Sequence, residues 1–171
     1  FLFILLVGLT YKYQHARRIY QKRFEAIIND QSPSLEHVGK VHVVPSHPLD
    51  ISQEKIDEVL ERLERFEQKR DFLDRKISAS KLSVIAEVNG KYLSQIITHY
   101  KGKRVMEYIN DLRVDAIIEQ MKQDRKLAYY SNGSLAEVAG FNSERTFVNA
   151  FKARVGITPI FFMQRLKAKG T

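Results

Sequence analysis

The C-terminal part of the chain contains one helical pattern twice, and this repeat constrains the fold more than any other feature of the sequence. In the first copy a short apolar stripe stops at Asn89-Gly90, a pair that readily adopts the positive φ of a tight turn. A second helix follows at once. The inner residues are Leu82, Ile85, Ala86 and Val88 before the turn, and Leu93, Ile96, Ile97 and Tyr100 after it. Two short helices joined by a tight turn are typical of a helix-turn-helix unit.

The second copy repeats this order. Its short helix, which contains Leu135, Ala136, Val138 and Ala139, ends at Gly140, and Phe141 docks the turn. Asn142 or Ser143 can cap the helix that follows. Leu93 and Phe147 occupy equivalent places in the two copies, 54 residues apart. One copy alone is a weak signal, because many pairs of core helices look like this, whereas the recurrence predicts two helix-turn-helix units.

Between the two copies, apolar residues recur at helical spacing over a long segment. They are Val105, Ile109, Leu112, Ala116, Ile117 and Met121. We therefore expect an all-α fold in which two helix-turn-helix units, joined by a long linker helix, form one domain over residues 76–171. Arg113 lies in the linker helix beside Asp111 and Asp115, and we expect a structural ion pair there rather than a DNA contact.

Residues 51–75 are predicted to form an amphipathic helix, with Ser52 as its N-cap. Its apolar stripe consists of Ile56, Val59, Leu60, Leu63 and Phe66. This stripe is expected to pack on the residues that follow or on a second copy of the chain, which is a weak indication of a homodimer.

Residues 31–50 contain three of the four prolines and no helical apolar period, so we interpret them as a linker. His37, His42 and His47 lie in this segment and raise the question of a metal site. Cysteine is absent from the sequence, and no cluster of carboxylates accompanies these histidines to complete a coordination shell. We therefore expect neither a metal nor a cofactor.

The N-terminal residues 1–9 are uncharged and apolar, and aromatic and basic residues follow them. Nine helical residues cover about 13 Å, less than half of a hydrocarbon core about 30 Å thick. We interpret residues 1–30 as the end of a transmembrane helix and a basic juxtamembrane segment. Tyr11 and Tyr13 suit the interfacial belt, and the positive-inside rule places Lys12, Arg17, Arg18, Lys22 and Arg23 on the cytoplasmic side. The alternative is a buried amphipathic helix.

The net charge of +8 resides entirely in the C-terminal part of the chain. Residues 76–171 hold 16 basic and 8 acidic side chains, whereas residues 1–75 hold 12 of each. A basic, compact domain favours a polyanionic partner, either nucleic acid or an anionic membrane surface. The sequence contains no cysteine nucleophile, no phosphate-binding glycine-rich loop and no histidine pair at metal-ligand spacing, so an enzyme is not expected.

Residues 135–159 resemble the second half of the AraC/XylS DNA-binding domain. The matching features are Leu135-Ala136, Gly140-Phe141, Phe147, Phe151-Lys152 and Gly156-Ile157-Thr158-Pro159. Upstream, residues 91–117 are similar to the first recognition helix and linker helix of that family, through Tyr92-Leu93-Ser94, Gly102, Tyr108-Ile109 and Leu112-Arg113. The resemblance implies a sequence-specific transcription regulator that reads two successive major grooves of double-stranded DNA. One departure is Asn132, where relatives carry an aliphatic residue; Asn132 or Ser134 is expected to cap the second unit.

The resemblance also implies which residues contact DNA. The family's base-reading positions correspond to Lys91, Ser94 and Gln95 in the first unit and to Glu144, Arg145 and Asn149 in the second. In the major groove Arg145 suits guanine, Gln95 and Asn149 suit adenine, and Glu144 suits cytosine. Phosphate contacts are expected from helix N-termini and from Lys101, Lys103, Arg104, Lys152 and Arg154.

The order of apolar segment, basic stretch, linker and DNA-binding domain further resembles the membrane-tethered AraC-type regulators of Bacteroidetes. That resemblance implies a cytoplasmic DNA-binding domain anchored to the bacterial inner membrane, with RNA polymerase as a further partner. Two alternatives stay open. The chain is either part of a soluble cytosolic regulator of the same family, or a basic helical module that docks on anionic membrane or on protein partners.

Overall fold

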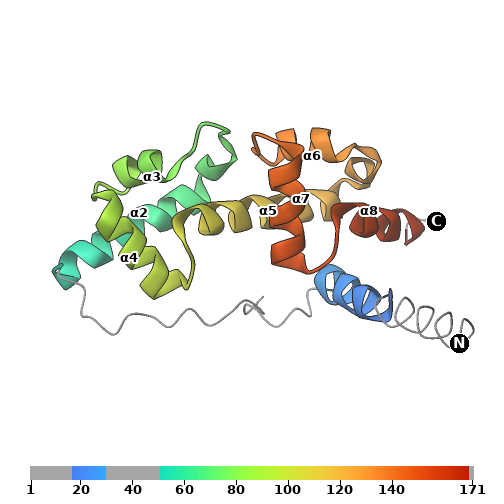
Figure 1. Ribbon diagram of the computed structural model, residues 1–171, viewed down its shortest axis with the longest axis horizontal. Helices are drawn as coiled ribbons and strands as arrows, with labels where there is room; N and C mark the ends of the chain where they lie inside the picture. The colour runs from blue at the N-terminus through green and yellow to red at the C-terminus, as the bar shows by residue number, and fades with distance from the viewer. Residues whose placement is uncertain (1–16, 30–50, 170–171) are drawn as a thin grey trace, which may run out of the picture.

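A computed structural model describes residues 17–29 and 51–169, and every regular element in these two ranges is helical (Figure 1). The elements are a helix over residues 17–28, α2 (Gln53–Gln68), η1 (Asp71–Leu73), α3 (Ala79–Ile85), α4 (Gly90–Lys101), α5 (Val105–Gln123), η2 (Arg125–Tyr129), α6 (Asn132–Val138), α7 (Glu144–Val155) and α8 (Pro159–Ala168). The predicted all-α architecture is confirmed: α3–α4 and α6–α7 are the two helix-turn-helix units, and α5 joins them.

The core of the first unit forms between α4 and the apolar stripe of α2. Leu93, Ile96 and Ile97 are fully buried on α4, and α2 contributes Ile56, Val59, Leu63 and Phe66. The predicted N-cap of α2 is confirmed, since the Ser52 hydroxyl accepts a hydrogen bond from the backbone N–H of Lys55. Residues 51–75 therefore share one core with the unit that follows. Because this stripe is already covered by the same chain, it no longer indicates a homodimer. The homodimer stays a prediction.

The core of the second unit is built from phenylalanine rings on α7, α8 and the turn before α7. Edge-to-face contacts join Phe141 to Phe147, Phe147 to Phe151, and Phe151 to Phe162, with ring centroids 5.5–5.7 Å apart. Edge-to-face contacts of this kind add stability beyond the burial of their area. All four rings are at most 1% exposed. The aromatic pair Phe161-Phe162 packs α8 onto this core.

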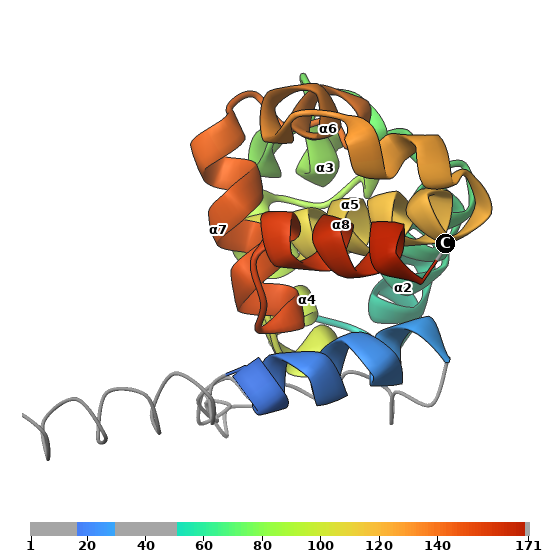
Figure 2. The same ribbon diagram turned by 90° about the vertical axis from the view of Figure 1, so that its right-hand side faces the viewer.

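The helix over residues 17–28 packs against the second unit (Figure 2). Phe24 and Ile27 are buried, and the rings of Phe24 and Tyr20 meet those of Phe162 and Phe161 at 5.2 and 5.4 Å. This is the alternative of a buried amphipathic helix, so the structure does not support a free juxtamembrane segment over these residues. Within the described ranges, no helix is both long enough and apolar enough to cross a bilayer. The apolar residues 1–9 and the linker at 31–50 with its three histidines lie outside the described residues.

The two units share one capping scheme, residue for residue. Ser78 and Ser131 cap the first helices, Asn89 and Ser143 cap the second helices, and Gly102 and Gly156 end the second helices in the left-handed conformation. Equivalent residues of the two units are 53 residues apart in the first helices and 54 apart in the second helices. The difference arises because the second turn contains one additional residue, Asn142. This matching supports the interpretation of the sequence as a repeat.

Two of the predicted turn details are wrong. Asn89 has a φ of −68° and accepts a hydrogen bond from the N–H of Tyr92 at 2.9 Å, so it caps α4 and Gly90 is its first residue. The left-handed residue of this turn is Glu87, with a φ of 50°, and its carboxylate pairs with Arg62. In the second unit α6 is capped by Ser131 rather than by Asn132 or Ser134.

Candidate DNA-binding surface

The second helices of the two units, α4 and α7, have equal length and run in the same sense. Each has 12 residues, and in Figure 1 each descends from the first helix of its unit. Leu93 and Ile97 in α4, and their equivalents Phe147 and Phe151 in α7, are completely buried. The buried positions fix the rotation of each helix about its axis, so equivalent residues of α4 and α7 face outward.

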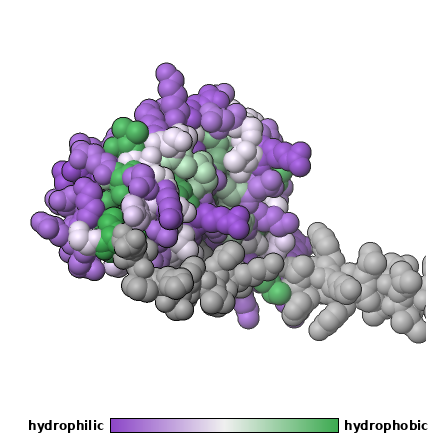
Figure 3. Space-filling view, turned by 60° about the vertical axis from the view of Figure 1, so that its left-hand side comes forward, coloured by the Kyte–Doolittle hydropathy of each residue, from purple (hydrophilic) through white to green (hydrophobic). Residues whose placement is uncertain are grey.

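All six predicted base-reading residues lie on the exposed faces of these helices. They are Lys91, Ser94 and Gln95 in α4, and Glu144, Arg145 and Asn149 in α7. Within the described residues none of the six forms a salt bridge or a side-chain hydrogen bond, so their polar groups are available to a ligand. Figure 3, which brings the first unit forward, shows a largely hydrophilic face that is crossed by a band of apolar side chains. The structure therefore groups the predicted residues three to a helix.

The five predicted phosphate-contacting residues divide into two groups. Arg104 precedes α5 and Lys152 lies in the last turn of α7, and both are exposed. The other three have carboxylate partners inside the protein. Lys101 places its Nζ 3.2 Å from Oε1 of Glu67, and Lys103 and Arg154 belong to a buried cluster around Asp111.

The Asp111 cluster attaches α7 to the linker helix α5. The Nζ of Lys103 lies 2.6 Å from Oδ2 of Asp111, and Nη1 of Arg154 lies 3.8 Å from the same oxygen. Arg154 also donates to both carboxylate oxygens of Asp115, at 3.0 and 2.7 Å. Burial by itself lowers the pKa of Arg154, but the hydrogen bond and charge of Asp115 and the charge of Asp111 raise it above its ordinary value. The cluster thus positions the recognition helix, a role that the sequence analysis missed.

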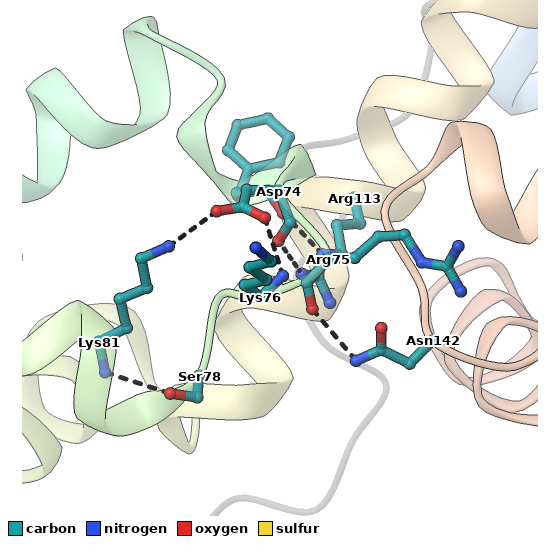
Figure 4. A network of polar contacts seen from close by, with 8 residues as sticks. Asp74, Arg75, Lys76, Ser78, Lys81, Arg113 and Asn142 are labelled. Carbon is teal, nitrogen blue, oxygen red and sulfur yellow. Dashed lines mark hydrogen bonds and ion pairs between the residues drawn. The ribbon is translucent and has the colours of Figure 1, made fainter.

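Arg113 is structural, as predicted, but its partners are not the neighbouring aspartates. It is 3% exposed, and its Nε and Nη2 donate to the backbone carbonyls of Phe72 and Asp74 at 2.7 and 3.0 Å (Figure 4). The guanidinium also lies over the ring of Phe141, 5.5 Å from its centroid. Arg113 therefore joins the segment after α2 to the turn of the second unit. The predicted ion pair with Asp111 or Asp115 is wrong, because those carboxylates face Lys103 and Arg154 instead.

Two further contacts join the same segment to the second turn. The side-chain amide of Asn142, the residue that makes this turn longer, donates to the carbonyl of Arg75 at 3.1 Å (Figure 4). Gly140 lies so close to η1 that a Cβ at this position would be 2.3 Å from the carbonyl oxygen of Leu73. Together with α5, these contacts hold the two recognition helices in one fixed relative orientation.

The Tyr108 side chain on α5 provides a test of this packing through pH. Its hydroxyl donates to Oε1 of Glu67 at 2.7 Å, and burial, with the hydrogen bond and charge of Glu67, raises the pKa of the phenol. Above pH about 10 the phenol ionises in the unfolded chain but stays protonated in the folded one, so stability falls as pH rises. We expect the parent protein to lose up to about 1.4 kcal/mol per pH unit more than Tyr108→Phe above pH about 10, in urea unfolding at several pH values.

The matched control for Tyr108→Phe is Tyr129→Phe, which removes the same hydroxyl from a side chain that is 73% exposed. Its alkaline profile is expected to follow that of the parent protein. Parallel profiles for the parent and Tyr108→Phe would show that the buried phenol does not contribute to the alkaline loss of stability.

Comparison with known families identifies the class of this arrangement. Residues 82–165 match the sequence model of a helix-turn-helix domain family of the AraC type, and this range extends from α3 into α8. The resemblance to the AraC/XylS DNA-binding domain is therefore confirmed for this segment. Within these residues the match to a helix-turn-helix domain supports DNA binding and transcription regulation.

Two solved structures are among those that match the chain. One is the C-terminal domain of AraT, a response regulator from Geobacillus stearothermophilus, with a TM-score of 0.50 and 17% identity over 63% of this chain and 84% of that chain. The other is the C-terminal domain of the two-component response regulator yesN from Fusobacterium nucleatum, with a TM-score of 0.49 and 21% identity over 61% of this chain and 96% of that one. No curated protein matches the sequence. The comparisons do not support the membrane-tethered type.

Proposed function

We propose that this chain is the DNA-reading part of a sequence-specific transcription regulator, and that α4 and α7 enter successive major grooves of one duplex. The observation that carries the proposal is the pair of equivalent recognition helices with exposed polar faces, held in one orientation by α5 and by Arg113. A helix of 19 residues such as α5 is about 28 Å long, comparable with the roughly 34 Å between successive major grooves on one side of the duplex.

Base contacts in this proposal come from the exposed residues of the first two turns of each recognition helix. The guanidinium of Arg145 matches O6 and N7 of guanine, and the amides of Gln95 and Asn149 match N6 and N7 of adenine. Glu144 accepts from N4 of cytosine, while Lys91 and Ser94 reach base edges as donors. These six residues supply specificity because the major groove distinguishes all four base pairs.

Phosphate contacts come from Arg104, Lys152 and the N-terminus of α5. The N-cap of α5 is Arg104, which provides no side-chain hydrogen bond to the first N–H groups of the helix. Those N–H groups are free to donate to a phosphate, and Arg104 adds a positive charge at the same place. Lys101, Lys103 and Arg154 are also proposed to contact phosphate. Their contributions are expected to be smaller, because each side chain already has a carboxylate partner.

Salt dependence separates these contributions. We expect Arg104→Ala and Lys152→Ala each to reduce the slope of log Kd against log salt concentration by about 0.9, because each removes one phosphate contact. Lys69→Ala removes the same charge from an exposed position after α2 and is expected to leave the slope unchanged. Equal slopes for all four proteins, measured by fluorescence anisotropy, would exclude Arg104 and Lys152 from the interface.

The proposed function is tested by selecting duplexes from a random pool with the full 171-residue chain. We expect an enriched motif of two blocks about one helical turn apart, and Arg145→Ala should relax the base preference in one block by about tenfold or more. Binding without any enriched sequence would contradict the proposal. In that case, anionic surfaces in general would be the better description of the partner.

Attachment to the inner membrane is a finer proposal, and it rests on residues 1–23. Of its basic cluster, Arg17, Arg18 and Lys22 are exposed on the helix whose other side is buried on the second unit. Flotation of the full chain with vesicles containing anionic lipid tests it, with Arg17, Arg18 and Lys22 replaced together by Gln as the comparison. Failure of the parent chain to float would overturn membrane attachment and leave the DNA-reading proposal untouched.

A further inference from the structure

The two recognition helices present the same pair of chemistries at the same positions. From Asn89 and Ser143 onward the helices correspond with a constant offset of 54 residues. Lys91 then corresponds to Arg145, a cation at the second helical position, and Gln95 corresponds to Asn149, an amide four residues later. Residues four apart lie on one face of a helix, one turn from each other. Each helix therefore offers the groove a cation and an amide in the same order.

The spatial relation between the two units is a translation along α5 with the helices in the same sense. In Figure 1, α3 and α6 lie above α5, and α4 and α7 both run downward from them. A two-fold axis between the units would reverse one recognition helix relative to the other, as in helix-turn-helix dimers that bind palindromes. Units related by translation read the same strand in the same direction, so equal chemistry predicts a direct repeat.

The equivalent positions also differ in two ways that make the two halves of the DNA site unequal. Lys91 is a point charge, whereas the planar fork of Arg145 matches two acceptors of guanine at once, so Arg145 discriminates more strongly. Glu144 in the second unit corresponds to Gly90 in the first, which has no side chain. A carboxylate at this place accepts from cytosine and repels the acceptor edges of other bases and the phosphates.

We infer that the operator of this chain is an imperfect direct repeat with a period of about one helical turn. Each half contains a guanine read by Lys91 or Arg145 and an adenine read by Gln95 or Asn149, in the same order on the same strand. The half read by α7 is the more stringent one and contains an additional cytosine opposite Glu144. The inference depends on the proposed function, since it describes how that same surface reads DNA.

The test begins with the sequences selected by the full chain and continues with designed duplexes. We expect two related blocks in the same orientation. A duplex whose second block is inverted in place should bind about 10- to 100-fold more weakly than the direct repeat, because the contacts of one helix are lost. The strength of the guanine preference should differ between the blocks, with the larger penalty for replacing guanine in the block that α7 reads.

Reciprocal substitutions assign the blocks. Arg145→Lys should weaken the guanine preference of the stringent block by about tenfold and leave the other block unchanged, whereas Lys91→Arg should strengthen the preference of the other block. Lys69→Arg, at an exposed position outside the recognition helices, is the matched control and should change neither. Blocks that are inverted or unrelated, or substitutions that affect the wrong block, would overturn the direct repeat while leaving sequence-specific binding intact. Binding without enriched sequences would overturn both.

Discussion

Replacing Gly140 with alanine is expected to lower the free energy of unfolding by about 2–5 kcal/mol. Gly140 has a φ of +78°, and an alanine in the left-handed region costs about 1–2 kcal/mol. In addition, its Cβ would lie 2.3 Å from the carbonyl oxygen and 2.8 Å from the carbonyl carbon of Leu73. These are backbone atoms of η1, so the turn and η1 must move apart, and an overpacked core site of this kind costs about 1–3 kcal/mol.

Two other glycines provide matched controls for Gly140→Ala. Gly102 has a similar φ of +65°, but nothing lies within 4 Å of an added Cβ, so Gly102→Ala measures the backbone cost alone, about 1 kcal/mol. Gly90 has neither a positive φ nor a close neighbour, and Gly90→Ala is expected to be neutral or slightly stabilising. The three variants are compared by urea unfolding. Equal losses at Gly140 and Gly102 would show that the approach to Leu73 is not a constraint on the fold.

The contacts that Gly140 and Arg113 make are also where sequence reasoning reached its limit. Helical periodicity, cap residues and the repeat are local signals, and they were sufficient to predict both units, the linker helix, Ser52 as a cap, and either Asn142 or Ser143 as the cap of α7. The position of Leu73 beside Gly140 depends on how η1 returns to the second unit, 67 residues later. No periodic pattern in the sequence indicates that Leu73 and Gly140 lie close together.

The incorrect assignment of an ion pair to Arg113 has the same origin. Asp111 and Asp115 are neighbours of Arg113 in sequence, yet residues two apart on a helix point in different directions and do not face each other. Asp111 and Asp115, four apart, share a face, and that face is covered by α7 with Arg154. Helical spacing could have excluded the Arg113 ion pair, but only the packing of α7 on α5 could reveal Arg154 as the partner.

The candidate site was easier to predict than the contacts that support it. Lys91, Gln95, Arg145 and Asn149 follow from the resemblance to the AraC/XylS family, and the structure places all four on exposed faces of α4 and α7. The orientation of these helices depends on buried polar groups, which have no sequence signature comparable with an apolar stripe. The sequence thus predicts a candidate DNA-binding surface whose six base-reading residues are exposed, but it assigns Lys103 and Arg154 to phosphate without revealing the carboxylates that hold them.

Replacing Arg113 is expected to have the largest effect of any single charged residue, about 2–4 kcal/mol for Arg113→Met. Methionine fills much of the same volume, so the loss mainly reflects the buried carbonyl of Phe72, which would lose its donor, whereas the carbonyl of Asp74 keeps the N–H of Ile77 as a donor. A buried acceptor left unsatisfied costs about 1–3 kcal/mol, and the contact with the Phe141 ring adds to this. Burial lowers the pKa of Arg113, partly offset by the charge of Asp74, but the group stays charged at neutral pH.

Arg70→Ala is the matched control for Arg113, because Arg70 also pairs across elements, with Glu119 at 3.0 Å, but on an exposed surface. Its loss is expected to be at most about 1 kcal/mol. Arg113→Lys should be intermediate, because a single ammonium cannot reproduce two donors in a fixed plane. The second measurement is the coupling between the two helix-turn-helix units. Without Arg113 the units are held mainly by α5, so unfolding should separate into two transitions. The affinity for specific DNA should also fall. A single transition with undiminished affinity would mean that α5 alone fixes the spacing of the recognition helices.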